Sequence, residues 1–183
     1  IPVTLGLLAA DGSDMPLRLD GEASAVGTSR VLAVTEAEQT FTFVGVAERP
    51  QPSLLRGFSA PVKLDYPYSR DQLMFLMQHD SDGFSRWEAG QQLSVQVLQE
   101  LIGQHQRGEE LALDERLITA LRTLLQNDKL DAAMVAEMLS LPGESYLAEI
   151  SEVADVDAIH AARGFARKRI ADALFEPLWQ RYQ

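Results

Sequence analysis

Three side chains that could bind a metal ion stand together in the segment HDSDG, which supplies His79, Asp80 and Asp82. A calcium loop of the EF-hand type needs oxygen ligands at its first, third and fifth positions and glycine at its sixth. Counted from Asp80, the fifth position is Phe84, and Gly83 comes too early. We therefore interpret the segment as structural: His79 lies at the negative end of one helix, and the aspartates cap the next helix.

Zinc-dependent hydrolysis needs two histidines one helical turn apart, with a glutamate beside the first that activates the bound water. The pattern H-E-x-x-H is absent, and His79, His105 and His160 are far apart in the sequence. Asp155 and Asp157 form a D-x-D pair that could hold magnesium, but they fall where a helix is expected to begin, so capping explains them better. We predict no metal ligand in this chain.

Nucleophilic catalysis lacks its usual patterns as well, because the chain has no G-x-S-x-G, no glycine-rich phosphate loop and no cysteine. One basic cluster, formed by Arg163, Arg167, Lys168 and Arg169, could bind an anionic ligand. A solvated helix face paired with nearby acids explains that cluster more simply. We predict no catalytic residue and no cofactor-binding residue.

The composition excludes two classes of partner. The 183 residues carry 16 Lys and Arg against 27 Asp and Glu, a net charge of −11, which repels nucleic acid and anionic membrane surfaces. No run of about 18 apolar residues is present to span a membrane. The lack of cysteine fits a reducing compartment. The opening run IPVTLGLLAA reads as a strand that has already begun, so we expect the start to be either a boundary within a longer protein or a processed end.

Residues 1–66 read as short strands separated by turns. Asp11-Gly12 offers turn chemistry between a strand over 3–8 and a return strand over 15–19. Further strands are expected in RVLAVTE, in QTFTFVGV, which alternates most clearly, and twice in LLRGFSAPVKLDY. The prolines of ERPQPS mark a loop or an edge crossing. We predict a small antiparallel β-sandwich that is incomplete at its N-terminus.

Residues 67–183 read as amphipathic helices, because the hydrophobic period changes to about 3.6 after Pro67. Ser69 with Gln72, and Ser85 with Glu88, have the spacing of capping boxes. We expect six helices, starting near Ser69, Ser85, Asp114, Asp131, Ser145 and Asp155, with the second ending near Gly108. Such helices stack as a bundle or a solenoid-like array. Met77, Phe84 and Trp87 are interpreted as packing between the first helices and the sandwich.

Three segments carry a resemblance to a known family: AEQTFTF, LLRGFSAPVKLDY and FLMQHDSDGFSRWEAGQQL. Across essentially its whole length the chain resembles the bacterial aminopeptidase N branch of the zinc gluzincin aminopeptidases. The resemblance implies an immunoglobulin-like β-sandwich domain over 1–66 and the first helices of the C-terminal helical domain over 67–183. The family's zinc and catalytic motifs, H-E-x-x-H and G-x-M-E-N, have no counterpart in this sequence.

The resemblance implies that the chain is a non-catalytic part of a cytoplasmic zinc aminopeptidase, which removes N-terminal residues from peptides. Its partners would be the catalytic domain and the remaining helices of the same protein. The sandwich would support the catalytic domain, and the helices would begin a lid over the active site. The alternative is a free-standing protein-interaction module, a sandwich with a helical platform and no catalytic role.

Overall fold

The computed structural model describes residues 1–182, which form two compact units. The first unit, Ile1–Glu88, contains all the β-structure and the first helix. The second unit begins at Ala89 and is helical. The long helix α2 (Gly83–Gln106) starts in the first unit and continues into the second.

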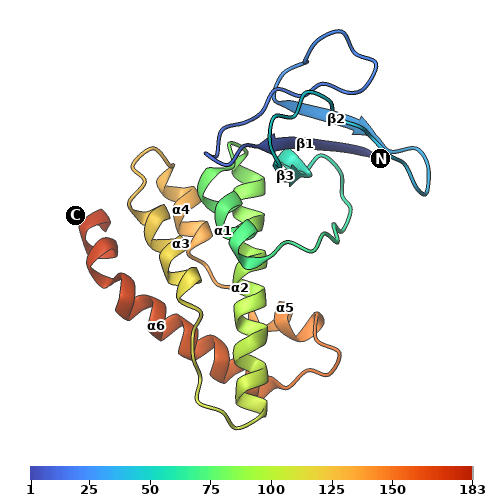
Figure 1. Cartoon of the computed structure of the whole chain (residues 1–183). Coiled ribbons are helices and arrows are strands. Elements are labelled where there is room, and N and C mark those ends of the chain that lie inside the picture. The colour runs from blue at the N-terminus through green and yellow to red at the C-terminus, as the bar shows by residue number, and fades with distance from the viewer. Residues whose placement is uncertain (183) are drawn as a thin grey trace. The chain divides into compact units, whose positions relative to one another are not determined.

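One three-stranded antiparallel sheet organises the first unit. Strand β1 (Pro2–Leu8) lies between β2 (Ser29–Ala33) and β3 (Gln51–Leu54), as Figure 1 shows. Val3 is opposite Leu32, and Gly6 is opposite Ser53. Strand β3 contains a proline and stands at the edge of the sheet, where a missing N–H does not interrupt a central ladder. The edge crossing predicted for ERPQPS is thereby confirmed.

A compact apolar cluster lies on one side of this sheet. Its buried members are Leu5, Leu7, Leu17 and Leu32, and partly buried side chains that include Phe41 and Phe43 pack against it. The alternation of QTFTFVGV placed these two phenylalanines on one face, and both do contact the core.

The predicted two-layer sandwich is not confirmed, since a single named sheet exists within residues 1–182. The segment QTFTFVGV contributes only an isolated bridge between Leu19 and Phe43. The predicted return strand over 15–19 is also absent, because its N–H groups go to separate partners: Met15 donates to Leu7, and Leu17 donates to Gly27. A strand needs one continuous partner, and these segments cover the core without one.

The prediction of two strands in LLRGFSAPVKLDY is wrong. After Leu54 the chain turns into a short 3₁₀ helix, η1 (Arg56–Phe58). Leu55, Gly57 and Phe58 have φ values of 57°, 63° and 51°, in the left-handed region. This conformation costs a non-glycine residue roughly 1–2 kcal/mol, so the surrounding contacts must hold the turn in place.

The first helix follows its sequence signals, whereas the second starts earlier than predicted. In α1 (Arg70–His79) both bonds of the predicted capping box form, between Ser69 and Gln72. Helix α2 already begins at Gly83, because Asp82 Oδ1 accepts from the N–H of Ser85 at 2.8 Å. Ser85 therefore lies inside the helix, and the capping box predicted for it is wrong.

The second unit contains α3 (Glu115–Leu125), α4 (Ala132–Met138), α5 (Glu144–Glu149) and α6 (Val156–Tyr182). The predicted caps Asp114, Asp131 and Asp155 each accept from backbone N–H groups of the first helical turn. Helix α5 starts one residue before the predicted Ser145, with Gly143 at the N-cap position, a position that glycine tolerates. Helix α2 ends as predicted, with Gly108 at a φ of 68°.

Helix α6 organises the second unit. Helices α3 and α5 pack against α6, and α4 packs against α3 (Figure 1). Ala158, Ala162 and Ala166, four residues apart on α6, are all fully buried, and such small side chains allow close helix contact. At the far end Arg181 Nη1 donates to the carbonyl of Leu125 at 2.7 Å and so satisfies the last turn of α3. None of the helices in residues 1–182 has the length and apolarity required for a membrane span.

The cap of α2 can be tested with a pair of variants three residues apart. Asp82→Ala removes the cap and is expected to lower the free energy of unfolding by about 1–2 kcal/mol. Ser85→Ala is the matched control: its hydroxyl is buried and has no hydrogen-bond partner within residues 1–182, so we expect a change of less than about 0.5 kcal/mol. Urea unfolding followed by circular dichroism measures both variants. A larger loss of unfolding free energy for Ser85→Ala than for Asp82→Ala would show that Ser85 is the capping residue.

Candidate functional site

A buried guanidinium stands at the centre of the first unit. The side chain of Arg56 is only 4% exposed, and its Nη2 lies 2.6 Å from Asp14 Oδ1 and 3.1 Å from Asp80 Oδ1. Its Nε donates to Ser53 Oγ at 2.9 Å. Asp80 is fully buried, so water screens this pair little. Arg56, Asp14 and Asp80 are referred to below as the arginine cluster.

The backbone beside the cluster leaves room for the guanidinium. The 3₁₀ turn η1 packs against β1, and Gly6 stands on β1 opposite Ser53. A Cβ atom on Gly6 would come within 2.1 Å of Arg56 Cζ, far inside van der Waals contact. A side chain at this point of the central strand would therefore displace the guanidinium.

The structural role predicted for HDSDG is confirmed, and the structure adds a second role. His79 ends α1, and Asp82 caps α2. In addition, Asp82 Oδ1 accepts from the N–H of Gly57 at 3.1 Å, and the buried carboxylate of Asp80 pairs with Arg56. The segment between the two helices is thus tied to the turn that follows β3.

Two further side chains complete this link. Ser81 Oγ donates to the second carboxylate oxygen of Asp14 at 2.5 Å. Arg86, on the first turn of α2, donates from Nε and Nη2 to the backbone carbonyl of Asp80, at 3.0 Å and 2.5 Å. Each of these groups already has a partner within the protein, so the cluster serves to join elements.

Burial governs the electrostatics of the cluster. It raises the pKa of Asp80 above its ordinary value of 3.8, while the Ser53 hydroxyl, the N–H of Asp82 and the charge of Arg56 act in the opposite direction. Burial also lowers the pKa of Arg86, and the nearby Asp80 opposes that shift. Asp80 Oδ2 is buried without a hydrogen-bond partner in the described chain, which marks a local cost of holding this carboxylate inside.

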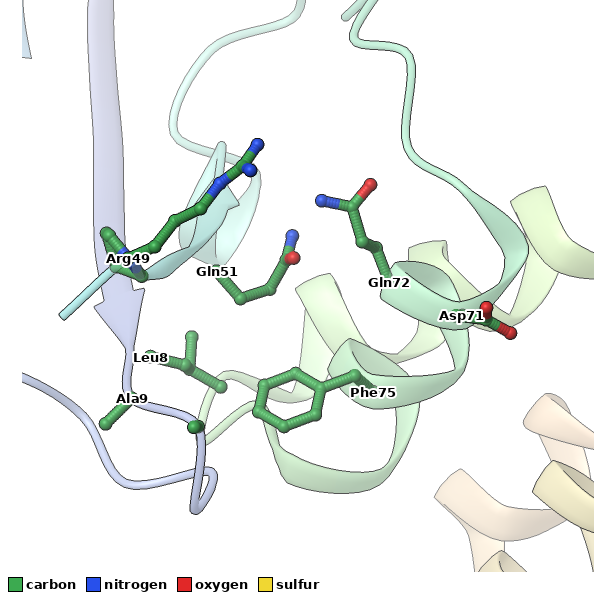
Figure 2. Close-up of a pocket in the computed structure, with 9 residues that line it drawn as sticks. Leu8, Ala9, Arg49, Gln51, Asp71, Gln72 and Phe75 are labelled. Carbon is green, nitrogen blue, oxygen red and sulfur yellow. The ribbon is translucent and has the colours of Figure 1, made fainter.

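A pocket of about 350 Å³ opens in the first unit where the end of β1, the start of β3 and the first turn of α1 meet. Figure 2 shows the side chains of Gln51 and Gln72 directed toward the opening and the carboxylate of Asp71 directed away from it. Phe75 and the buried Leu8 form an apolar wall. Among the described residues, the lining includes one cation, Arg49, but no histidine, serine or cysteine. Such a surface can donate hydrogen bonds, but it has no nucleophile and base pair.

The other carboxylates and histidines that were considered lie at ordinary positions. Asp155 Oδ1 accepts from the N–H of Ala158 at 3.0 Å, and this bond is the main reason that its pKa is lowered. His160 Nδ1 lies 3.0 Å from Glu144 Oε1 on the surface. Within residues 1–182 no three His, Cys, Asp or Glu side chains are grouped as a set of metal ligands.

The basic cluster of α6 divides into two pairs. Arg163 and Arg167 line a second pocket, formed within the second unit, whereas Lys168 and Arg169 do not. Arg169 instead lies 3.9 Å from Glu115. Within residues 1–182 the predicted pairing with an acid thus describes Arg169 alone.

The aromatic residues near the start of α2 pack as predicted. The ring of Phe84 lies 5.2 Å from that of Phe58 and 5.8 Å from that of Trp87, and Met77 is fully buried. The sequence reasoning missed the arginine cluster. Its one available signal was a charged residue, Arg56, inside the apolar run LLRGF, because a charge that interrupts a buried run must find a partner.

Comparison with known proteins places this arrangement in a family. Residues 70–183 match the family described as "Domain of unknown function (DUF3458_C) ARM repeats", and residues 1–67 match "Domain of unknown function (DUF3458) Ig-like fold". The chain belongs to the DUF3458_C family. An Ig-like domain followed by an ARM-like helical domain is therefore its organisation at the level of the family.

The relatives of this DUF3458_C chain are aminopeptidases. It is 39% identical over 178 residues to aminopeptidase N of Escherichia coli (strain K12), covering 97% of this chain and 20% of that protein. It is 40% identical over 174 residues to aminopeptidase N of Haemophilus influenzae, covering 95% of this chain and 20% of that protein. The expected resemblance to the aminopeptidase N family is confirmed, and the chain spans about a fifth of the length of these relatives.

A solved structure shares the fold of the DUF3458_C chain. The crystal structure of Legionella pneumophila aminopeptidase A in complex with aspartic acid matches it with a TM-score of 0.73 and 29% sequence identity. The match covers 99% of this chain and 20% of that protein. The chain therefore matches a part of that larger protein in fold.

Arg56→Met tests the arginine cluster. The variant leaves two carboxylates near a buried site without their cation, so we expect it to lower the free energy of unfolding by about 3–5 kcal/mol. Arg107→Met is the matched control, because Arg107 pairs with Glu109 at the surface, where loss of a pair costs less than about 1 kcal/mol. Denaturant unfolding measures both variants. Equal losses of unfolding free energy would show that the buried cluster contributes no more to stability than a surface ion pair.

The raised pKa of Asp80 predicts a dependence on pH with a definite sign. The folded state binds the proton of the Asp80 carboxyl group more tightly than the unfolded state does. The contribution of Asp80 to the free energy of unfolding therefore increases as the pH falls toward 3.8. The free energy of unfolding of the wild type, minus that of Asp80→Asn, should therefore increase on acidification. Asp155→Asn should show the opposite trend, because the pKa of Asp155 is lowered. Urea titrations at several pH values measure both differences, and a decrease for Asp80 would contradict the prediction.

Proposed function

We propose that this chain is a non-catalytic part of a longer, cytoplasmic, zinc-dependent aminopeptidase that removes N-terminal residues from peptides. In this proposal the zinc, the general base and the site for the substrate amine belong to another part of that protein. None of residues 1–183 is catalytic or binds a cofactor. The proposal extends the activity of the relatives to the protein that contains this chain.

The observation that carries the proposal is the coverage. The chain aligns with aminopeptidases along 97% of its own length but along only 20% of theirs, so most of their sequence has no counterpart in it. The absence of the H-E-x-x-H pattern supports the same proposal, because that pattern supplies two histidines that bind the zinc and a glutamate that activates the bound water. The internally paired carboxylates of the arginine cluster also support it, because they hold elements together.

Each domain has a mechanical role in this proposal. The domain over 1–66, an immunoglobulin-like β-sandwich when complete, supports the catalytic domain, and the helices of 67–183 begin a lid over the active site. Its partners are the catalytic and remaining helical domains of the same protein. The arginine cluster suits this role, because Arg56 links the first domain, through Asp80, to the start of the helices.

Hydrolysis of an alanyl arylamide tests the proposal. The purified chain should release no arylamine, with or without added zinc, whereas the protein encoded by the whole gene should release it and lose this activity to a chelator. Activity of the chain alone that a chelator abolishes would refute the non-catalytic role. An inactive protein from the whole gene, or a gene without a zinc motif upstream, would favour the free-standing interaction module.

A further inference from the structure

The second unit contains an apolar pocket of about 300 Å³ between α6 and the segment that follows α4. Its apolar wall includes Leu141, Ile170, Leu174 and Leu178. Two arginines, Arg163 and Arg167, line the same pocket and come from successive turns of α6, so they share a helix face. Apolar walls with a few polar groups are typical of sites for small ligands, and this volume lies at the lower end of their range.

The two arginines are not neutralised by the protein. Within residues 1–182 neither Arg163 nor Arg167 has a carboxylate partner, in a chain that has an excess of eleven acidic residues. Arg163 is held in place, because its Nε donates to the carbonyl of Pro142 at 2.8 Å, which leaves its two terminal nitrogens for another acceptor. Arg167 is exposed. A carboxylate at this pocket would therefore find two guanidinium groups, the partner geometry that carboxylates favour.

Ser140 adds a group that can accept a hydrogen bond. It lines the pocket, and its hydroxyl donates to the carbonyl of Ala136 at 3.2 Å, so the lone pairs of Oγ stay available. The carbonyl of Ser140 is already used by Gln91 Nε2 at 3.0 Å. The pocket thus combines a site for a carboxylate, an acceptor for one N–H and an apolar wall.

We propose that this pocket binds the C-terminal residue of a peptide when that residue has an apolar side chain. The terminal carboxylate pairs with Arg163 and Arg167, the amide N–H of the residue donates to Ser140, and the side chain lies against the leucine and isoleucine wall. A fatty acid offers the carboxylate and the apolar group but no N–H, which makes it the poorer match. All the residues of this pocket lie in the second unit, and binding there does not depend on the peptidase proposal.

The test follows amide chemical shifts of the chain during titration with N-acetyl-L-leucine, which presents the three groups of such a residue. We expect saturable shifts centred on α6 and the segment after α4, and much weaker shifts with N-acetyl-L-leucinamide, which lacks the charge. Arg167→Met should weaken the binding by about five-fold, as expected for one partly screened charge pair. Lys168→Met removes the same charge from the adjacent position outside the pocket and should leave the affinity unchanged.

A second variant blocks the pocket itself. Ala171 lines the pocket and is exposed, so Ala171→Phe adds bulk there without entering the core and should abolish the shifts. The proposal is overturned if no saturable shifts occur, if the amide binds as well as the acid, or if Lys168→Met weakens binding as much as Arg167→Met. Tighter binding of octanoate would assign the pocket to an acyl chain and overturn the peptide assignment.

Discussion

The first unit depends on the burial of one positive charge. An arginine removed from water is costly unless carboxylates meet it with good geometry, and here Asp14 and Asp80 do so at 2.6 Å and 3.1 Å. Asp14, Arg56 and Asp80 come from three separate parts of the chain: the turn after β1, the turn after β3 and the end of α1, respectively. Because no two of them are close in sequence, the pairing fixes the path of the chain in a way that apolar packing alone would not.

The same charge accounts for two unusual features of the backbone. The turn around Arg56 contains two non-glycine residues with positive φ, Leu55 and Phe58. Such strain persists only where other contacts outweigh it, and the buried pair with its hydrogen bond to Ser53 provides those contacts. Gly6 is the second feature, since a side chain at this position of the central strand would displace the guanidinium. The backbone of the small three-stranded sheet is thus adapted to the buried Arg56 as well as to its leucine core.

The sequence predicted local features well and distant pairing poorly. The caps at Ser69, Asp114 and Asp131 were predicted correctly because each bond joins residues two or three positions apart, which the sequence contains in full. The alternation of QTFTFVGV predicted which residues face the core, but a strand also needs a neighbour, and none of the local residues specifies one. Arg56 was missed for the same reason, since its acidic partners lie 42 and 24 residues away.

The charged side chains of the two units differ in whether the protein itself already pairs them. In the first unit the carboxylates that meet Arg56 are buried or partly buried, and each is paired with that arginine. In the second unit Arg163 and Arg167 stand at a pocket with no carboxylate beside them in the described residues. A buried charge that the fold has paired cannot be removed singly without leaving its partner uncompensated, whereas an unpaired charge at an apolar pocket is available to a ligand. Under the proposal made for this pocket, recognition of a small acidic group needs no catalytic residue, because its two arginines supply the charge and its apolar wall supplies the contact.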